Sequence, residues 1–348
     1  MKKEAEKMLD HLTKLIAERI APWGQVPLLQ EIFQSEEPAT VARHIYEFCE
    51  AELGQQPAEA LFFFCSIGVV FGLEMPGKQR IVIKAHKPER PLTLLTQMGD
   101  VQRYLVARGY PCPCPVAGPR PLGKGLATID ELVDEGVFRD AHDPAVRKAI
   151  ATALRELIQL LRHVEQDGID PTPFDLRLPS DVLWPKPHNA IFDFEATREG
   201  AEWIDELAWK VKRIIEADER EPILAHGDFS ANQMRFVGDH LRMVYDWDSL
   251  TLRSELVSVG ATASTFTYSE QPGITNVETT HADAAAFISD YEAARQQPFT
   301  PEEQRIIQAA TLLGQLYGTR CQHALHPHEH KYSRTWYEQM LTEYGTIL

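Results

Sequence analysis

Residues 224–248 contain two short apolar segments, and each of them runs into acidic side chains. The first segment leads into His-Gly-Asp at 226–228, and an amide, Gln233, follows five residues after that aspartate. The second segment, 241–245, leads into Asp-Trp-Asp at 246–248. An apolar strand followed by a tight turn places a carboxylate at the strand end, so the two segments can bring several oxygens together. Such oxygens suit Mg²⁺, which prefers one or two carboxylates plus phosphate oxygens.

The two motifs together resemble the catalytic core of the aminoglycoside phosphotransferase family, which includes choline kinase-like, methylthioribose kinase-like and maltokinase-like small-molecule kinases. This family is a branch of the protein-kinase-like fold, whose own catalytic loop begins His-Arg-Asp. The resemblance covers roughly residues 60 to 345. It implies an α+β, bilobal fold with a small β-rich N-lobe and a larger, mainly helical C-lobe. A strand turn with a capping carboxylate is the alternative, but it leaves the second acidic segment unexplained.

The resemblance implies a role for each side chain of the two motifs. Asp228 is the expected catalytic base, which orients the acceptor hydroxyl and takes its proton. Asp246 is expected to bind the Mg²⁺ that bridges the β- and γ-phosphates. His226 belongs to the catalytic loop and is expected to brace it by hydrogen bonding.

The remaining metal ligands stay open. Gln233 falls where most of the family has a metal-binding Asn, although some maltokinase-like members carry Gln there. Asn232 is the competing ligand, but its use requires a register shifted by one residue. Asp248 is a candidate for a second metal ligand or for a supporting position.

The N-terminal part carries features that the resemblance assigns to nucleotide binding. Lys84 ends the β-branched run 81–84 and is expected to contact the α- and β-phosphates; the alternative is an exposed strand-end lysine. Ser66 and Gly68 form a weak counterpart of the family's glycine-bearing nucleotide loop. The helix predicted over 92–108 contains no Glu, although the family's helix usually supplies one to pair with this lysine.

Three polar residues of that helix are candidates for the missing Glu. Gln97 is the one that we assign to the nucleotide site. Asp100 and Gln102 remain alternatives, because periodicity alone does not decide which side chain faces Lys84.

Hydrophobic periodicity predicts helices over 4–53, 92–108, 144–164, 203–218 and most of 282–348. It predicts β-structure over 61–73 that forms a hairpin with 81–84, further β-structure over 126–133, and short strands at 223–225 and 241–245 flanking a turn at Gly238. A proline-rich stretch precedes residue 126, and residues 168–200 read as irregular. We expect three parts: a helical N-terminal extension (1–58), a nucleotide-binding N-lobe (59–134) and a catalytic, acceptor-binding C-lobe (135–348).

The negative charge is concentrated in one part of the chain. The net charge is −16, from 35 basic and 51 acidic residues. Residues 1–130 hold 15 basic and 15 acidic side chains. The whole excess of negative charge therefore lies in residues 131–348, which hold 20 basic and 36 acidic side chains. Such a surface repels nucleic acid and anionic membranes and attracts cations, or it only aids solubility.

Several other patterns carry little functional weight. The longest mainly apolar run, 60–73, is too short to span a bilayer, and the polar N-terminus lacks a signal peptide's apolar core. Five scattered cysteines favour reduced thiols, although Cys112 and Cys114 are close enough to share a soft metal. Residues 118–125 nearly match a P-loop but end in Gly instead of Ser or Thr, which favours a hairpin loop. The four histidines in 323–330 favour a surface loop over a metal site.

These patterns predict a cytoplasmic phosphotransferase that uses ATP and Mg²⁺ to phosphorylate a small-molecule hydroxyl. The acidic C-terminal part suits a cationic, aminoglycoside-like acceptor, whereas the tryptophans suit a sugar; core packing is their simpler role. A non-catalytic nucleotide-binding regulator on the same fold is the alternative. A protein kinase is disfavoured because no Ala-Pro-Glu follows Asp246. The oligomeric state is open.

Overall fold

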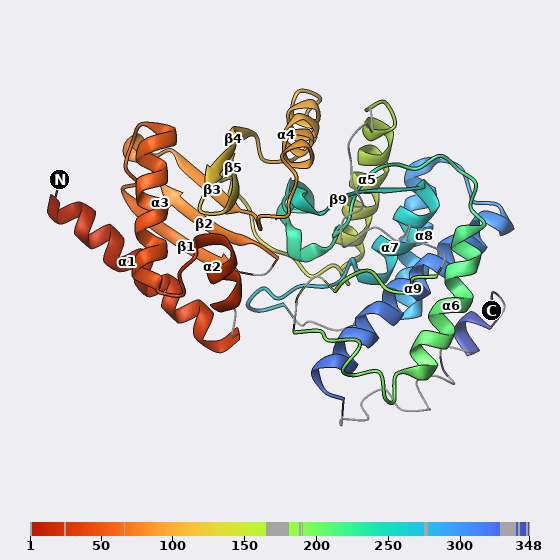
Figure 1. Ribbon diagram of the computed structural model, residues 1–348. Helices are drawn as coiled ribbons and strands as arrows, with labels where there is room; N and C mark the ends of the chain where they lie inside the picture. Colours follow the sequence, from red (N-terminus) through yellow and green to blue (C-terminus); the bar gives the residue numbers. More distant parts are fainter. Residues whose placement is uncertain are drawn as a thin grey trace. The chain divides into compact units, whose positions relative to one another are not determined.

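The computed structural model describes residues 2–23, 26–65, 67–164, 181–187, 189, 191–274, 278–327, 339, 342–345 and 347. The chain divides into two compact units, Met1–Asp134 and Glu135–Leu348, whose elements are drawn in Figure 1. The three-part division of the sequence stays a prediction. Among the described residues, no helix combines the length and apolar character that crossing a membrane requires.

The first unit contains a five-stranded antiparallel sheet with the order β1-β2-β3-β5-β4. The strands are β1 (Glu59–Cys65), β2 (Val69–Glu74), β3 (Arg80–Ala85), β4 (Pro115–Leu122) and β5 (Gly125–Glu131), with a 3₁₀ turn, η1 (Pro76–Lys78), between β2 and β3. The β-segment predicted over 61–73 is therefore two strands. The chain reverses near Gly68, where a Cβ would lie only 2.9 Å from the Ala85 carbonyl oxygen.

Strand β4 was not expected as a strand, because it contains Pro115, Pro119 and Pro121. Proline has no N–H to donate to a ladder, so it is tolerated mainly at sheet edges. β4 lies at the edge of the sheet and pairs only with β5, with irregular register between Pro115 and Arg120.

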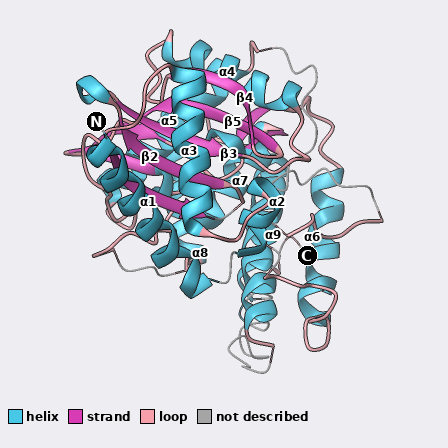
Figure 2. Cartoon of the chain, turned by 60° about the vertical axis from the view of Figure 1, so that its left-hand side comes forward, coloured by secondary structure: helices cyan, strands magenta, loops and turns pink. Residues whose placement is uncertain are grey.

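Helices α1 (Lys2–Trp23), α2 (Val26–Phe33) and α3 (Pro38–Leu53) share one hydrophobic core with the sheet. α3 runs across the strands (Figure 2), and Gly54 ends it in a left-handed conformation. The strand positions in this core alternate, as one face of a sheet requires: Phe63, Cys65, Phe71, Leu73, Ile81, Ile83, Ala85, Ala127 and Ile129. Side chains at the intervening positions, Lys84 among them, therefore lie on the opposite face. Helix α4 (Leu92–Val106) packs against β4.

The second unit is mainly helical. Its helices are α5 (Pro144–Leu161), α6 (Glu202–Glu216), α7 (Glu255–Thr265), α8 (His281–Arg295) and α9 (Pro301–Leu325). Its strands are β6 (Ile223–His226), β7 (Met234–Val237), β8 (His240–Val244) and β9 (Leu250–Arg253), and 3₁₀ turns lie at η2 (Ala231–Gln233) and η3 (Trp247–Ser249).

Two short antiparallel pairs connect the segments that carry the acidic motifs. β7 and β8 form a hairpin around Gly238, and β6 pairs with β9. The sequence pattern predicts β6 and β8 but neither β7 nor β9. Each missed strand has four residues and directly follows a 3₁₀ turn.

A buried arginine holds part of the segment that was predicted as irregular. The Arg320 side chain is 1% exposed, and its guanidinium lies 4.6 Å from the Phe194 ring centroid and donates to Thr197 Oγ1 at 3.2 Å. Asp205 lies 3.7 Å from Arg320 Nε and accepts a hydrogen bond from Trp184 Nε1 at 2.7 Å. Burial lowers the pKa of Arg320, an effect that Asp205 opposes. These contacts attach Trp184, Phe194 and Thr197 to α6 and α9.

Helices α7 and α9 pack closely because Gly260 has no side chain. A Cβ on Gly260 would lie 2.3 Å from the Ile307 carbonyl oxygen and 2.6 Å from the Ala310 Cβ. Ser254 caps α7 by accepting from the Val257 N–H, and Thr300 begins α9 with a capping box.

We expect Gly260→Ala to lower the free energy of unfolding by about 1–3 kcal/mol, because the methyl group would force α7 and α9 apart. Gly318→Ala, on the exposed side of α9, is the matched control. No atom lies within 4 Å of its added Cβ, so this variant should be neutral or more stable by about 0.5–1 kcal/mol. Urea unfolding of both variants measures the difference, and equal stabilities would contradict this account of the helix contact.

Candidate functional site

Asp228 lies in the turn that follows β6, and its carboxylate is held from two sides. Oδ1 accepts a hydrogen bond from Ser230 Oγ at 3.0 Å, and Oδ2 accepts one from Gln233 Nε2 at 2.8 Å. Gln233 ends the short turn η2, which places its amide five residues after Asp228 and back beside it. The carboxylate therefore has a fixed orientation at the end of a strand.

His226 connects this turn to the second acidic motif. Its Nε2 lies 2.8 Å from the Tyr245 carbonyl oxygen, which can only accept, so Nε2 carries the proton. Nδ1 then accepts from the Asp228 N–H at 3.2 Å and lies 3.1 Å from Ser249 Oγ. The ring is 4% exposed and makes an edge contact with Trp247. These contacts support the bracing role expected for His226, and they place Trp247 in the core.

Asp246 follows β8 in a left-handed conformation, with φ 67° and ψ 45°. A non-glycine residue with positive φ is uncommon and is often found at functional sites. Its carbonyl oxygen accepts from Ser249 N at 3.2 Å and from Ser249 Oγ at 2.9 Å. Backbone bonds from Gly227 N to Ser249 O (2.9 Å) and from Tyr245 N to Gln233 O (2.8 Å) join the two motifs. The acidic segments predicted from the sequence therefore belong to one hydrogen-bonded unit.

The oxygen atoms of this unit suit a hard cation. Gln233 directs its amide nitrogen to Asp228, so its Oε1 is the atom that could bind a cation beside that carboxylate. Asp246 and Asp248 are partly buried and lie on or next to η3. No group of three His, Cys, Asp or Glu side chains in the described part of the chain forms a ready metal cage. A cation here would therefore need further oxygens, which is usual for Mg²⁺ with a phosphate substrate.

Asn232, the competing candidate ligand, forms hydrogen bonds to the segment that follows α7. Its Oδ1 accepts from the Glu270 N–H at 3.0 Å and from Gln271 Nε2 at 3.3 Å. Its side chain thus holds the segment that follows α7. Of the two amides, Gln233 is the one whose side chain lies against Asp228.

Sequence reasoning missed Tyr268 and Glu270, which lie beside the catalytic loop. The Tyr268 hydroxyl donates to Glu270 Oε1 at 2.6 Å. Burial around that hydroxyl, the bond to Glu270 and the negative charges of Glu270 and Asp228 raise the pKa of Tyr268. No motif marks these residues, because only the fold brings them to Asp228.

The first unit carries the other predicted residues. Lys84 lies on the sheet face opposite α1–α3, with Val70 and Thr128 as its cross-strand neighbours. On the same face, the Phe62 ring covers Gly72, where a Cβ would lie 2.2 Å from the ring. This face thus carries the Lys84 side chain together with apolar surface.

The three candidates on α4 differ in their partners. Asp100 pairs with Arg103 at 2.9 Å, and Gln102 Nε2 lies 3.3 Å from both the Pro113 carbonyl oxygen and Asp130 Oδ1. Gln97 Oε1 is buried and finds no hydrogen-bond partner within the described residues. Gln97 is therefore the candidate that can still accept from a cationic group. Gly68 lies in the turn between β1 and β2, and Ser66 lies outside the described residues.

Three other sequence patterns are accounted for by packing. Residues 118–125 form the β4–β5 hairpin, whose Lys124 N–H donates to the Ile32 carbonyl oxygen at 2.7 Å, so a hairpin loop is confirmed. All five cysteines are free, and burial raises the pKa of the Cys112 thiol to about 12. His323 Nε2 lies 3.0 Å from the Glu199 carbonyl oxygen, while the last two histidines of that cluster lie outside the described residues.

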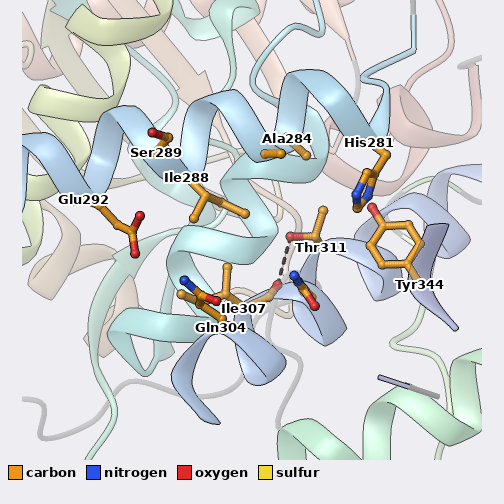
Figure 3. A pocket seen from close by; sticks show the side chains of 11 residues that line it. His281, Ala284, Ile288, Ser289, Glu292, Gln304, Ile307, Thr311 and Tyr344 are labelled. Carbon is orange, nitrogen blue, oxygen red and sulfur yellow. Dashed lines mark hydrogen bonds between the residues drawn. The ribbon is translucent and has the colours of Figure 1, made fainter. Parts of the chain in front are cut away.

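A cavity of about 190 Å³ lies between α8 and α9 (Figure 3). His281 and Tyr344 stand at one end of it, with ring centroids 4.7 Å apart, and Glu292 stands at the other. None of its lining residues belongs to the two acidic motifs.

No protein-family model matches this sequence, and no curated protein matches it. Solved structures that are similar to it in fold include the following three. The amicoumacin kinase hAmiN, in complex with AMP-PNP, Ca²⁺ and Ami, has a TM-score of 0.56 at 12% identity and covers 84% of this chain and 89% of its own. A Ralstonia eutropha JMP134 protein assigned as an aminoglycoside phosphotransferase has a TM-score of 0.51 at 18% identity. The match covers 87% of this chain and 98% of that protein. Plasmodium vivax ethanolamine kinase has a TM-score of 0.50 at 11% identity, and the match covers 96% of this chain and 93% of the kinase.

These similarities confirm the predicted fold class. The chain has the α+β, protein-kinase-like fold that small-molecule kinases and phosphotransferases share, with a β-rich N-terminal unit and a mainly helical C-terminal unit. The resemblance deduced from the two motifs is thereby confirmed at the level of the fold.

We expect His226→Ala to lower the free energy of unfolding by about 2–4 kcal/mol, because it leaves buried polar groups unpaired and opens a cavity. His240→Ala is the matched control, since His240 is exposed at the start of β8 and should change stability by less than about 0.5 kcal/mol. Urea unfolding measures both variants. An effect of His226→Ala no larger than that of the control would contradict the bracing role.

Proposed function

We propose that this protein is a phosphotransferase that uses ATP and Mg²⁺ to phosphorylate a hydroxyl of a small molecule. The observation that carries the proposal is the hydrogen-bonded unit of Asp228, Gln233 and Asp246, in which His226 ties the base to the acidic turn. The shared fold with hAmiN, whose complex holds AMP-PNP and Ca²⁺, supports the use of a nucleotide and a divalent cation.

Asp228 is suited to act as the general base. Each carboxylate oxygen can accept two hydrogen bonds, and Ser230 and Gln233 supply one to each oxygen. One acceptor position per oxygen is left for the proton of an acceptor hydroxyl. Because both donors fix the carboxylate before the substrate arrives, little reorientation is needed when the proton moves.

The residues present also fit a nucleotide with its metal. Bound ATP with Mg²⁺ would supply the phosphoryl group and the positive charge that offsets the charge of the phosphates. Asp246 and Gln233 are the proposed metal ligands. Asp248 is proposed as a further ligand or as a supporting residue. Lys84 is the proposed phosphate contact, and the unsatisfied Gln97 Oε1 is its proposed polar neighbour.

The other proposed nucleotide contacts are Ser66 and Gly68. The five free thiols are consistent with a reducing compartment, and we propose a cytoplasmic location on that ground. The proposed acceptors are amine-bearing compounds or sugars.

We expect Asp228→Asn to reduce turnover by about 10²–10⁴-fold while ATP binding changes little, because the amide keeps the shape but cannot take the proton. Asp239→Asn, an exposed carboxylate in the β7–β8 turn, makes the same change away from the site and should keep full turnover. Coupled detection of ADP measures turnover, and calorimetry measures ATP binding. Full turnover by Asp228→Asn refutes the assignment; Mg²⁺-dependent ATP binding without turnover in the wild type favours the regulator.

The Mg²⁺ dependence of ATP binding distinguishes the proposed metal ligands from neighbouring residues. We expect Asp246→Ala to abolish the gain in ATP affinity that Mg²⁺ produces, because it removes the carboxylate ligand. Asn232→Ala is the control, since its side chain holds Glu270 and Gln271 and should leave that gain in place. Calorimetric titration of each variant with ATP, with and without Mg²⁺, measures the effect. The opposite pattern would assign the metal to Asn232.

A further inference from the structure

The cavity between α8 and α9 lies within the second unit, and one face of α8 forms a wall of it (Figure 3). The lining side chains of that helix recur three and four residues apart from His281 to Glu292. Phe287 and Tyr291, on the core side of the same helix, are fully buried. The wall is therefore a second face of a helix that core packing already holds in place.

The two ends of the cavity carry groups that can still bind a ligand. At one end, His281 Nδ1 is buried and has no hydrogen-bond partner among the described residues. At the other end, Glu292 Oε1 accepts from the Phe299 N–H at 2.7 Å. Arg295, one turn further along α8, pairs with Glu255 at 3.3 Å, so Glu292 has no cationic partner in the described part of the chain.

The lining between these ends is uncharged. It combines apolar side chains with neutral ones that carry an oxygen atom: Ala284, Ala285, Ile288 and Ile307, and Ser289, Gln304, Gln308 and Thr311. At 1.5 Å per residue, His281 and Glu292 lie about 16 Å apart along α8. The cavity volume of about 190 Å³ corresponds to only about six water molecules, so a ligand that reaches both ends must be narrow.

Charge and shape together select the chemistry of such a ligand. Glu292 is the one formally charged side chain among the described residues that line the cavity, so the ligand's end there is a cation. An ammonium group is also a donor from which an imidazole Nδ1 can accept when the ring proton is on Nε2. A flexible methylene chain would contact the apolar side chains between the two ends.

We propose that this cavity is a second ligand site, which binds a linear alkyl diamine or polyamine with one ammonium group on Glu292 and another amine on His281 Nδ1. The inference goes beyond the proposed function and does not rest on it. A diamine without a hydroxyl has no oxygen to receive a phosphoryl group, so the ligand of this site is not an acceptor.

The contacts of α9 separate this cavity from the catalytic loop. α9 meets the last turn of α7 at Gly314, where a Cβ would lie 2.1 Å from Ser264 Oγ. The catalytic loop joins the chain just beyond that turn, because the Ala231 N–H donates to the Phe266 carbonyl oxygen at 3.0 Å. The lining residues of α9 all precede Gly314. The cavity thus lies on the N-terminal side of that junction along α9.

Two probes of the same chain length test the preference for charged ends. The whole protein, without nucleotide, is titrated calorimetrically with 1,8-diaminooctane and with 1,8-octanediol. We expect the diamine to bind about tenfold more tightly than the diol, because a hydrogen bond between an ammonium group and a carboxylate contributes on that order.

The variants then assign that preference to the cavity. Glu292→Gln keeps an oxygen that accepts from Phe299 and removes only the charge, so it should weaken diamine binding about tenfold and leave diol binding unchanged. His281→Phe keeps a ring beside Tyr344 and removes Nδ1, so it should also weaken diamine binding. Glu302→Gln is the matched control, since it removes an exposed carboxylate of α9 that does not line the cavity.

A third variant and a site comparison complete the test. Ala285→Leu narrows the cavity from its exposed side and should weaken diamine binding even if Glu292→Gln fails to fold. Asp228→Asn should leave diamine binding unchanged.

The outcomes separate this inference from the proposed function. Equal affinities for diamine and diol, no diamine binding by the wild type, or full diamine affinity in folded Glu292→Gln or in Ala285→Leu overturns it. Diamine binding that is lost in Asp228→Asn and kept in Glu292→Gln would place the diamine at the proposed active site, which also overturns it. A protein that binds the diamine at this cavity but no MgATP would refute the proposed function alone.

Discussion

The hydrogen bonds of one buried histidine hold the candidate site of the second unit together. His226 donates to the Tyr245 carbonyl oxygen and accepts from the Asp228 N–H, so a single ring sets the spacing between the Asp228 turn and the acidic turn at 246–248. Both bonds require a neutral ring with the proton on Nε2. Since the ring is buried, losing either partner leaves a polar group without water, and the cost of that state keeps the two turns together.

Around this ring, each polar side chain has a separate task. Gln233 and Ser230 orient the carboxylate of Asp228, while Asn232 holds Glu270 and Gln271 of the segment that follows α7. Two neighbouring amides in one turn therefore act on two different parts of the site. This division explains why Gln, although one methylene longer than Asn, fits its position: the extra length lets the side chain of Gln233 reach Asp228.

In the first unit, the packing of the sheet decides where Lys84 lies. Its sheet buries one face under α1–α3, and the two-residue alternation of β3 then obliges Lys84 to lie on the other face. The Phe62 ring packs directly over Gly72 on that face, and Gly68 approaches the Ala85 backbone closely. The helices before residue 58 thus stabilise the sheet without covering the side that carries the lysine.

The sequence by itself determined the fold class and the order of most elements, and it singled out Asp228, Gln233 and Asp246 as candidates, because spacing along the chain records these motifs directly. Only the tertiary structure decided that β6 pairs with β9, that Asn232 holds the segment after α7, and that Gln97 Oε1 is buried without a hydrogen-bond partner among the described residues. It also supplied Tyr268 and Glu270, which no local pattern marks. Periodicity reports which side of an element is buried, whereas a contact between residues about 40 positions apart depends on how the elements pack.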